Sequence, residues 1–185
     1  FFFKQKTAYE IYQCDWSSDV CSSDLHRTHQ YLLGIYSVIY GLHRTTLKRM
    51  KDDRGSVMHL LRSDSPRFSG FGEVYFSSIR CRAIKAWRRN HSATANFAVP
   101  VGAVEFVAFD SRPTSPTFNS KLLIVSGEDD YQLITVPAGV WYGFLGLAPS
   151  ESLIVNLLDK PYDPDASDRL EYPSSDVPHE WILEA

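Results

Sequence analysis

The chain has 185 residues, of which 44% are hydrophobic, and its 19 basic and 22 acidic side chains give a formal net charge of −3. A charge so close to neutral does not favour binding to nucleic acid or to an anionic membrane surface. The most apolar stretch, residues 31–42, is shorter than the roughly 18 residues of a membrane-spanning helix. We therefore expect no nucleic-acid partner and no membrane partner.

Residues 1–25 resemble translated sequencing-adapter DNA rather than the product of a gene. They contain two of the three cysteines, so only Cys81 remains in the rest of the chain. A lone cysteine cannot form an internal disulfide, which is typical of a reducing compartment and predicts a cytoplasmic location. We expect residues 1–25 not to pack on the domain. Residues 26–41 are either an extension or read-through from upstream DNA, and one domain covers residues 42–185.

From Gly55 onward the chain is a series of short β-branched and aromatic runs separated by turn residues, which is typical of a sandwich or barrel. After Asp159 the chain is acidic and rich in proline, and we expect a surface tail with at most one short helix, at residues 165–170. The predicted strands are residues 56–61, 72–78, 83–87, 96–101, 103–110, 121–125, 132–136, 141–147 and 153–158.

Several common catalytic and nucleotide-binding motifs are missing from the sequence. It contains neither Gly-x-Gly-x-x-Gly nor the Gly-rich P-loop pattern, which argues against nucleotide binding of the Rossmann or P-loop type. It also contains no Gly-x-Ser-x-Gly, so a serine-hydrolase site has no support.

Residues 137–144 resemble the second motif of the cupins, in which a histidine would occupy the position of Tyr142. The partner motif supplies a His-x-His pair, and Arg89-Asn90-His91 keeps one imidazole at most. A transition metal needs about three N or O ligands, and a phenol with a pKa of about 10 is a poor substitute for imidazole. We expect no metal and no other cofactor.

Four segments occur in the order and spacing of one known family: Asp53-Arg54-Gly55, Ser115-Pro116-Thr117, residues 137–144 and residues 159–164. Over about residues 42–182 the chain resembles a divergent dTDP-4-dehydrorhamnose 3,5-epimerase. The resemblance implies an all-β, cupin-type jelly roll (a double-stranded β-helix) that is usually a homodimer. It also implies binding of a nucleotide-activated 4-keto-6-deoxy sugar in cell-surface polysaccharide synthesis.

Members of that family move protons at carbons next to the ketone, which needs a base, a donor on the other face and a cation or hydrogen bond for the enolate oxygen. The family's histidine base corresponds to Arg88, and a guanidinium cannot act as a base because it stays protonated. The orienting aspartate corresponds to Asp159. The family's tyrosine and lysine correspond to Val155 and about Ala95, so three catalytic groups are unmatched.

The remaining catalytic candidates are His91 as base, Asp159 as its orienting partner and Tyr142 as proton donor. Each has a structural alternative: Asp159 can cap a turn, Tyr142 can fill the interior, and His91 can lie on the surface. Two functions therefore stay open. The first is an epimerase or isomerase, and the second is a non-catalytic sugar-nucleotide-binding cupin that has lost the base.

Lys85, Arg88 and Arg89 are candidate substrate-binding residues, because arginine grips a diphosphate through paired hydrogen bonds. If their strand continues, Lys85 and Arg89 share one face and Arg88 lies on the opposite face. A solvated basic edge with Trp87 packed inside is the alternative. Arg54 is a further substrate-binding candidate by its position in the family.

Overall fold

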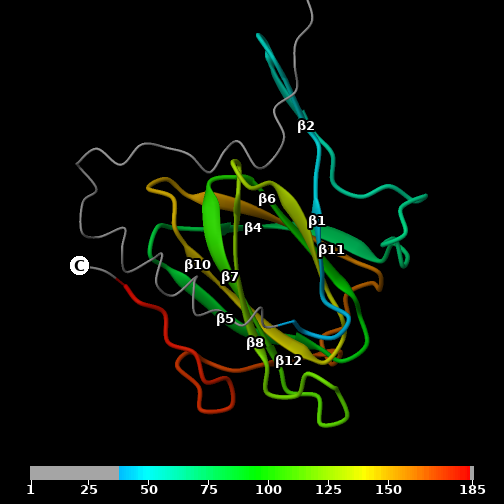
Figure 1. The fold of residues 1–185 in the computed structure, drawn as a ribbon, viewed down its shortest axis with the longest axis vertical. Coiled ribbons are helices and arrows are strands. Elements are labelled where there is room, and N and C mark those ends of the chain that lie inside the picture. Colours follow the sequence, from blue (N-terminus) through cyan, green and yellow to red (C-terminus); the bar gives the residue numbers. More distant parts are fainter. Residues whose placement is uncertain (1–37, 184–185) are drawn as a thin grey trace, which may run out of the picture. The chain divides into compact units, whose positions relative to one another are not determined.

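The computed structural model describes residues 38–183, and this part of the chain is built from antiparallel strands (Figure 1). None of the described residues belongs to a helix that is long and apolar enough to cross a membrane. The strands are β1 (His43–Thr46), β2 (Arg49–Asp52), β3 (Gly55–Met58), β4 (Glu73–Ile79), β5 (Ile84–Asn90), β6 (Ala95–Val101), β7 (Ala103–Asp110), β8 (Lys121–Gly127), β9 (Gln132–Val136), β10 (Val140–Gly146), β11 (Ser152–Leu158) and β12 (Ser167–Arg169).

The strands form two five-stranded sheets that pack face to face. The first sheet has the order β1-β9-β6-β11-β4, and the second has the order β12-β5-β10-β7-β8. Strands that follow one another in the chain often lie in different sheets, so the chain winds back and forth between the two layers (Figure 1). This arrangement confirms the predicted all-β jelly roll.

The core between the sheets is aromatic. The Phe97 ring lies 4.9 Å from the Tyr142 ring, and the Phe106 ring lies 5.5 Å from the Phe144 ring. Tyr142 and Phe144 point into this core, whereas their neighbour Trp141 points to the outer face of the second sheet. This alternation is the two-residue period of a strand that is buried on both faces.

The C-terminal part of the chain covers the outer face of the second sheet. Trp181 stacks on Trp87 with the ring centroids 4.9 Å apart, and Val177 is fully buried beside them. His179 is enclosed by the same rings, and burial, together with the nearby charge of Lys121, lowers its pKa to about 4. This cover explains why the outer face is as apolar as the inner one.

We expected at most one short helix at residues 165–170, and the structure has none there, because residues 167–169 form β12. Ser167 pairs with Asn90 and Arg169 pairs with Arg88, so β12 extends the second sheet beyond β5. The free backbone groups of an edge strand favour such an addition over a short isolated helix.

Every predicted strand corresponds to a strand of the structure, and β7 and β9 have the predicted bounds. Strand β5 runs on to Asn90, three residues beyond its predicted end at 87. The sequence analysis did not predict β1 and β2, because their short polar and basic sequences lack the apolar alternation of a half-buried strand.

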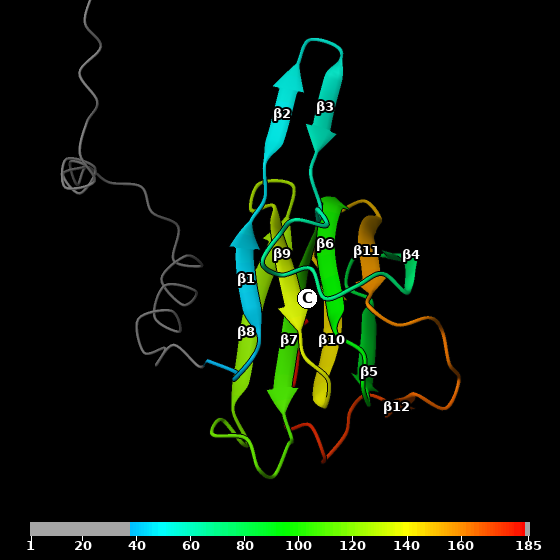
Figure 2. The ribbon, with the colours of Figure 1, turned by 90° about the vertical axis from the view of Figure 1, so that its right-hand side faces the viewer.

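The β2–β3 hairpin projects away from the two large sheets (Figure 2). At its base, the Arg49 guanidinium lies 3.0 Å from a carboxylate oxygen of Glu128. Before β1, Ile39 is buried in the core, so packing begins upstream of the predicted domain start at residue 42. The predictions for residues 1–25 concern a part of the chain outside the described residues. The same holds for the prediction on residues 26–41 as far as residue 37.

Candidate functional site

A cavity of about 200 Å³ opens where β4, an edge strand of the first sheet, meets β5 and β12 of the second sheet and the chain after β11. We call it the inner cavity. Its charged and polar lining combines a carboxylate from β4, a guanidinium from β5 and groups from the segment after β11. The lining residues are Glu73, Arg88, Asn90, Ser92, Ala93, Leu158, Lys160, Pro161, Tyr162, Asp163, Ala166 and Ser167.

Arg88 and Tyr142 form a cross-strand pair behind this cavity. They lie directly opposite each other in the β5–β10 ladder, so both side chains lie on the inner face. The Nε of Arg88 is buried without a hydrogen-bond partner among residues 38–183, whereas the hydroxyl of Tyr142 interacts with the side chain of Asn90. A buried polar group left unpaired costs about 1–3 kcal/mol, so Arg88, which lines the cavity, points to a ligand.

Two phenols next to Arg88 are held in their protonated form. Burial raises the pKa of Tyr142 above its usual range, and the Tyr75 phenol adds to this effect while Arg88 opposes it. Burial likewise raises the pKa of Tyr75, against the nearby charge of Arg88, and the carboxylate of Glu73 raises it further. At neutral pH both phenols can donate a hydrogen bond or a proton.

Glu73 is a cavity residue that was not predicted from the sequence. Its side chain forms no hydrogen bond and no ion pair within 4.0 Å with the described part of the chain, although it lines the same cavity as Arg88. A signal for it was present, because β4 carries Glu73 and Tyr75 on its inner face and exposes Val74 and Phe76. A strand that turns its polar residues inward and its apolar residues outward is typical of a binding cavity.

His91 lies outside the inner cavity, on a carboxylate of β12. Its Nε2 is 2.8 Å from Asp168 Oδ1, and Arg89 donates to the other oxygen of Asp168 from Nε at 3.0 Å. Hydrogen bonds from Arg89 and His91 lower the pKa of Asp168. The structure thus brings His91 and Arg89 together and separates both from Arg88. The role of His91 as base stays a prediction.

Asp159 shapes the wall of the cavity through the backbone. Its Oδ1 accepts a hydrogen bond of 2.8 Å from the amide of Thr94, which ties the chain before β6 to the end of β11. The residues on either side of it, Leu158 and Lys160, line the cavity. The geometry is that of a cap, and the role of Asp159 as the orienting partner of a base stays a prediction.

Strand β5 continues through the basic cluster, but the prediction that Lys85 and Arg89 share a face is wrong. The β5–β10 register shifts between Tyr142 and Phe144, so that Lys85 pairs with Phe144 on the inner face. The extra residue of such a bulge reverses the alternation of side chains. Lys85 therefore shares a face with Arg88, and Arg89 alone lies on the outer face.

Two predicted substrate-binding residues are engaged elsewhere. The Lys85 ammonium donates to the backbone carbonyl of Ser78, which bridges the second sheet to the first. Arg54 lies on the projecting hairpin, is 84% exposed and pairs with Asp52 at 2.8 Å. Neither residue lines the inner cavity, and their roles in binding stay predictions.

A wider hollow of about 640 Å³ lies on the outer face of the second sheet. Here the Arg89 guanidinium stacks 4.5 Å from the centroid of the Trp141 ring and bonds to the Ser111 hydroxyl at 3.2 Å. The hydrogen bonds to Ser111 and Asp168 already occupy Arg89, so this hollow offers no unpaired cation comparable to Arg88.

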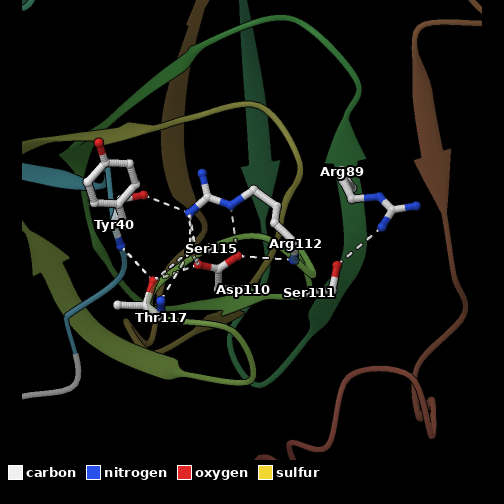
Figure 3. Close-up of polar contacts among 7 residues, drawn as sticks. All are labelled: Tyr40, Arg89, Asp110, Ser111, Arg112, Ser115 and Thr117. Atoms are coloured by element: carbon white, nitrogen blue, oxygen red, sulfur yellow. Dashed lines mark hydrogen bonds and ion pairs between the residues drawn. The ribbon is translucent and has the colours of Figure 1, made fainter.

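The Ser115-Pro116-Thr117 motif belongs to a polar network rather than to the cavity (Figure 3). Asp110, whose side chain is fully buried, accepts hydrogen bonds from Arg112 Nε at 2.8 Å, Ser115 Oγ at 2.6 Å and Thr117 Oγ1 at 2.7 Å. Arg112 also donates to the carbonyl of Tyr40 at 2.7 Å. Burial raises the pKa of Asp110, but the bonds from Arg112, Ser115 and Thr117 outweigh it and bring the pKa to about 2. We call these residues the Asp110 network.

Within residues 38–183 no group of three His, Cys, Asp or Glu side chains is placed to hold a metal ion. The inner cavity itself offers the carboxylate of Glu73, the guanidinium of Arg88 and the phenol of Tyr162. These groups suit the binding of an anionic or carbonyl-bearing ligand and the movement of a proton.

Comparison with known proteins points to one family. The profile of the dTDP-4-dehydrorhamnose 3,5-epimerase family matches residues 37–185. A probable low-salt glycan biosynthesis epimerase of Haloferax volcanii is 29% identical over 137 residues, which cover 72% of this chain and 88% of that protein. A spore coat polysaccharide biosynthesis protein of Bacillus subtilis is 28% identical over 139 residues, covering 75% and 92%. The crystal structure of a dTDP sugar isomerase from Desulfovibrio desulfuricans is similar with a TM-score of 0.76 and 38% identity, covering 77% of this chain and 92% of that one.

Proposed function

Since the chain belongs to the dTDP-4-dehydrorhamnose 3,5-epimerase family, we propose that it binds a nucleotide-activated 4-keto-6-deoxy sugar and epimerises or isomerises it. The reaction moves protons next to the ketone without a metal, and its product enters a cell-surface polysaccharide. The names of the glycan and spore coat relatives support this pathway. The observation that carries the proposal is the unpartnered Arg88 in the inner cavity.

The cavity suits the sugar end of such a substrate. Its volume of about 200 Å³ is below the roughly 300–1,000 Å³ of pockets that enclose a whole drug-sized ligand. We therefore place the sugar inside and the nucleotide at the mouth. Lys160 and Tyr162 line the mouth and supply a cation for the diphosphate and a ring for the base.

Arg88 has a different task from the family's base. A guanidinium cannot remove a proton, but it stabilises the negative charge that develops on the ketone oxygen when a neighbouring proton leaves. Tyr142, protonated and on the same face, is the proposed proton donor. His91 could serve as base only after leaving Asp168, and Asp159 would orient it.

The second candidate function is binding without catalysis. The same Arg88 favours it, because the resemblance implies that this residue corresponds to the family's histidine base and a guanidinium cannot act as a base. In that case the cavity would hold the nucleotide sugar and leave its carbon–hydrogen bonds intact.

One experiment on the whole chain separates the two functions. Calorimetric titration measures binding of a dTDP-4-keto-6-deoxy sugar, and proton NMR in D₂O measures deuterium incorporation next to the ketone. We expect the wild-type protein to bind the sugar and to incorporate deuterium. A loss of incorporation in His91→Ala and in Asp159→Ala would assign the base to His91. Binding without incorporation would establish the second function, and absence of binding would contradict both.

We also propose that the protein is a cytoplasmic homodimer. The β2–β3 hairpin exposes Met50 and Val57, and an isolated two-stranded hairpin is at best marginally stable in water. A second copy would cover these side chains and bring Arg54 to its surface. Light scattering should give the mass of a dimer, and Met50→Glu with Val57→Glu should shift it to that of a monomer. A wild-type monomer would contradict the dimer.

A further inference from the structure

The inner cavity has an acidic group and a basic group on facing walls. Glu73 comes from β4 in the first sheet, and Arg88 comes from β5 in the second sheet. Both groups influence the Tyr75 phenol, in opposite directions, so they act on the same small space. Even so, no ion pair within 4.0 Å joins either of them to another group in the described part of the chain.

Glu73 and Arg88 are both partly buried, and neither charge has an ion-pair partner among the described residues. Opposite charges that share one cavity would normally close into a salt bridge. The two sheets instead hold Glu73 and Arg88 apart. The space between them is where a polar ligand would replace the missing contact.

We infer that Glu73 is the catalytic base of the proposed reaction, in place of the histidine that the family uses. The inference rests on the proposed function, because it concerns the same cavity and the same sugar. It assigns Arg88 to the enolate oxygen and Tyr142 to the opposite face of the sugar.

The proton transfer balances with these groups alone. The Glu73 carboxylate takes the proton from the carbon next to the ketone, and the electron pair of that C–H bond becomes the C=C bond of an enolate. The carbonyl oxygen takes the negative charge and accepts hydrogen bonds from Arg88. Return of a proton to carbon restores the ketone, and exchange of the Glu73 proton with solvent labels the product. Carboxylate bases paired with hydrogen-bond donors at the oxygen are an established solution for such enolisations.

The other groups that could act as base are already engaged. Asp163, the second carboxylate of the cavity, accepts a hydrogen bond of 2.9 Å from the amide of Asp165. Asp159 accepts one from Thr94, and His91 pairs with Asp168. Glu73 alone among these groups combines a position in the cavity with a carboxylate that has no hydrogen bond or ion pair to the described residues.

The two sheets also supply the two faces that inversion requires. Glu73 approaches a sugar in the cavity from the first sheet, whereas Tyr142 lies on β10 of the second sheet. A base on one face and a donor on the other allow a proton to leave and return on opposite sides of a carbon. When Tyr142 donates, its phenolate regains a proton from solvent.

The test uses Glu73→Gln, which keeps the shape and removes the basic carboxylate, with Glu151→Gln as the matched control at an exposed position outside the cavity. Deuterium incorporation should fall at least about 100-fold in Glu73→Gln, the scale of a lost general base. Binding of the keto sugar should stay within a few-fold, and Glu151→Gln should retain both properties. Glu73→Ala should regain incorporation when formate is added, which a merely structural role would not produce.

The possible failures are distinct. Incorporation by Glu73→Gln at the wild-type rate would overturn the role of Glu73 and leave the proposed epimerase function intact. Binding without incorporation by the wild type would overturn the catalytic function and this inference with it. Absence of rescue by formate in a Glu73→Ala protein that still binds the sugar would also count against a base at this position.

Discussion

The inner cavity and the Asp110 network contain the same kinds of charged group, yet only in the network do these groups bond to one another. Asp110 receives hydrogen bonds from Arg112, Ser115 and Thr117. In the cavity, Arg88 buries a polar atom that has no partner among residues 38–183, and the side chain of Glu73 forms no ion pair with them. The difference separates polar groups that hold the fold from polar groups that are kept for a ligand.

The two regions also differ in how the chain assembles them. Most of the network comes from residues 110–117, which form the end of β7 and the turn after it. The cavity gathers side chains from β4, β5 and the segment after β11. A local network can be complete before the sheets pack, whereas the cavity exists only after they have packed.

The largest effect should come from breaking the network. Asp110→Ala leaves the partly buried Arg112 guanidinium without its carboxylate, and we expect a loss of about 3–5 kcal/mol in the free energy of unfolding, measured by urea denaturation. Asp64→Ala is the control, because Asp64 pairs with Arg62 in an exposed ion pair, and it should cause no measurable change. A loss below about 1 kcal/mol in Asp110→Ala would show that the network does not hold the fold.

The network should also lose strength in acid. The pKa of Asp110 is about 2 in the folded state and about 4 in the unfolded state, so the unfolded state binds more protons as the pH falls. Its contribution of about 2 kcal/mol is present above pH 4 and is lost as the pH falls towards 2. Urea midpoints of the wild type and Asp110→Asn should converge over this range. A constant difference would contradict the low pKa.

Removing one hydroxyl from the Asp110 network and one from the neighbourhood of the inner cavity should show that only the network stabilises the fold. Thr117→Val removes a donor to Asp110 and should cost about 1.5–3 kcal/mol, because hydrogen bonds to charged groups are worth this much. Tyr142→Phe removes a hydroxyl that interacts with the neutral side chain of Asn90 rather than with a charged group, so the free energy of unfolding should fall by at most about 1 kcal/mol. Thermal denaturation of both variants gives the comparison. An equal loss of stability in the two variants would contradict this difference between the two regions.

Arg88→Met should have the smallest effect on stability of these variants, although it should weaken binding of the keto sugar. Methionine replaces a partly buried guanidinium that has no ion pair among the described residues, so stability should be unchanged or rise by about 1 kcal/mol. The affinity for the keto sugar, measured by titration calorimetry, should fall about 10- to 100-fold. Arg62→Met should change neither quantity. A marked loss of stability in Arg88→Met would place Arg88 with the network.

Sequence patterns predicted the fold well because strands and turns depend on neighbouring residues. The apolar runs of β7 and β9 predicted where these two strands begin and end, and proline and glycine indicated the turns between strands. The short β12 was missed, because its pairing with β5 depends on residues far away in the chain. The inner position of Lys85 was missed for a similar reason, since it depends on a register shift against β10.

By itself, the sequence determined that the chain folds as an all-β roll and that it resembles this epimerase family. Only the tertiary structure decided that the Ser115-Pro116-Thr117 motif supports Asp110 and that Glu73 faces the cavity of Arg88. Short stretches of sequence determine the local backbone conformation of strands and turns. Which side chains share a cavity depends on sheet order, register and bulges, and these are set by contacts between distant segments.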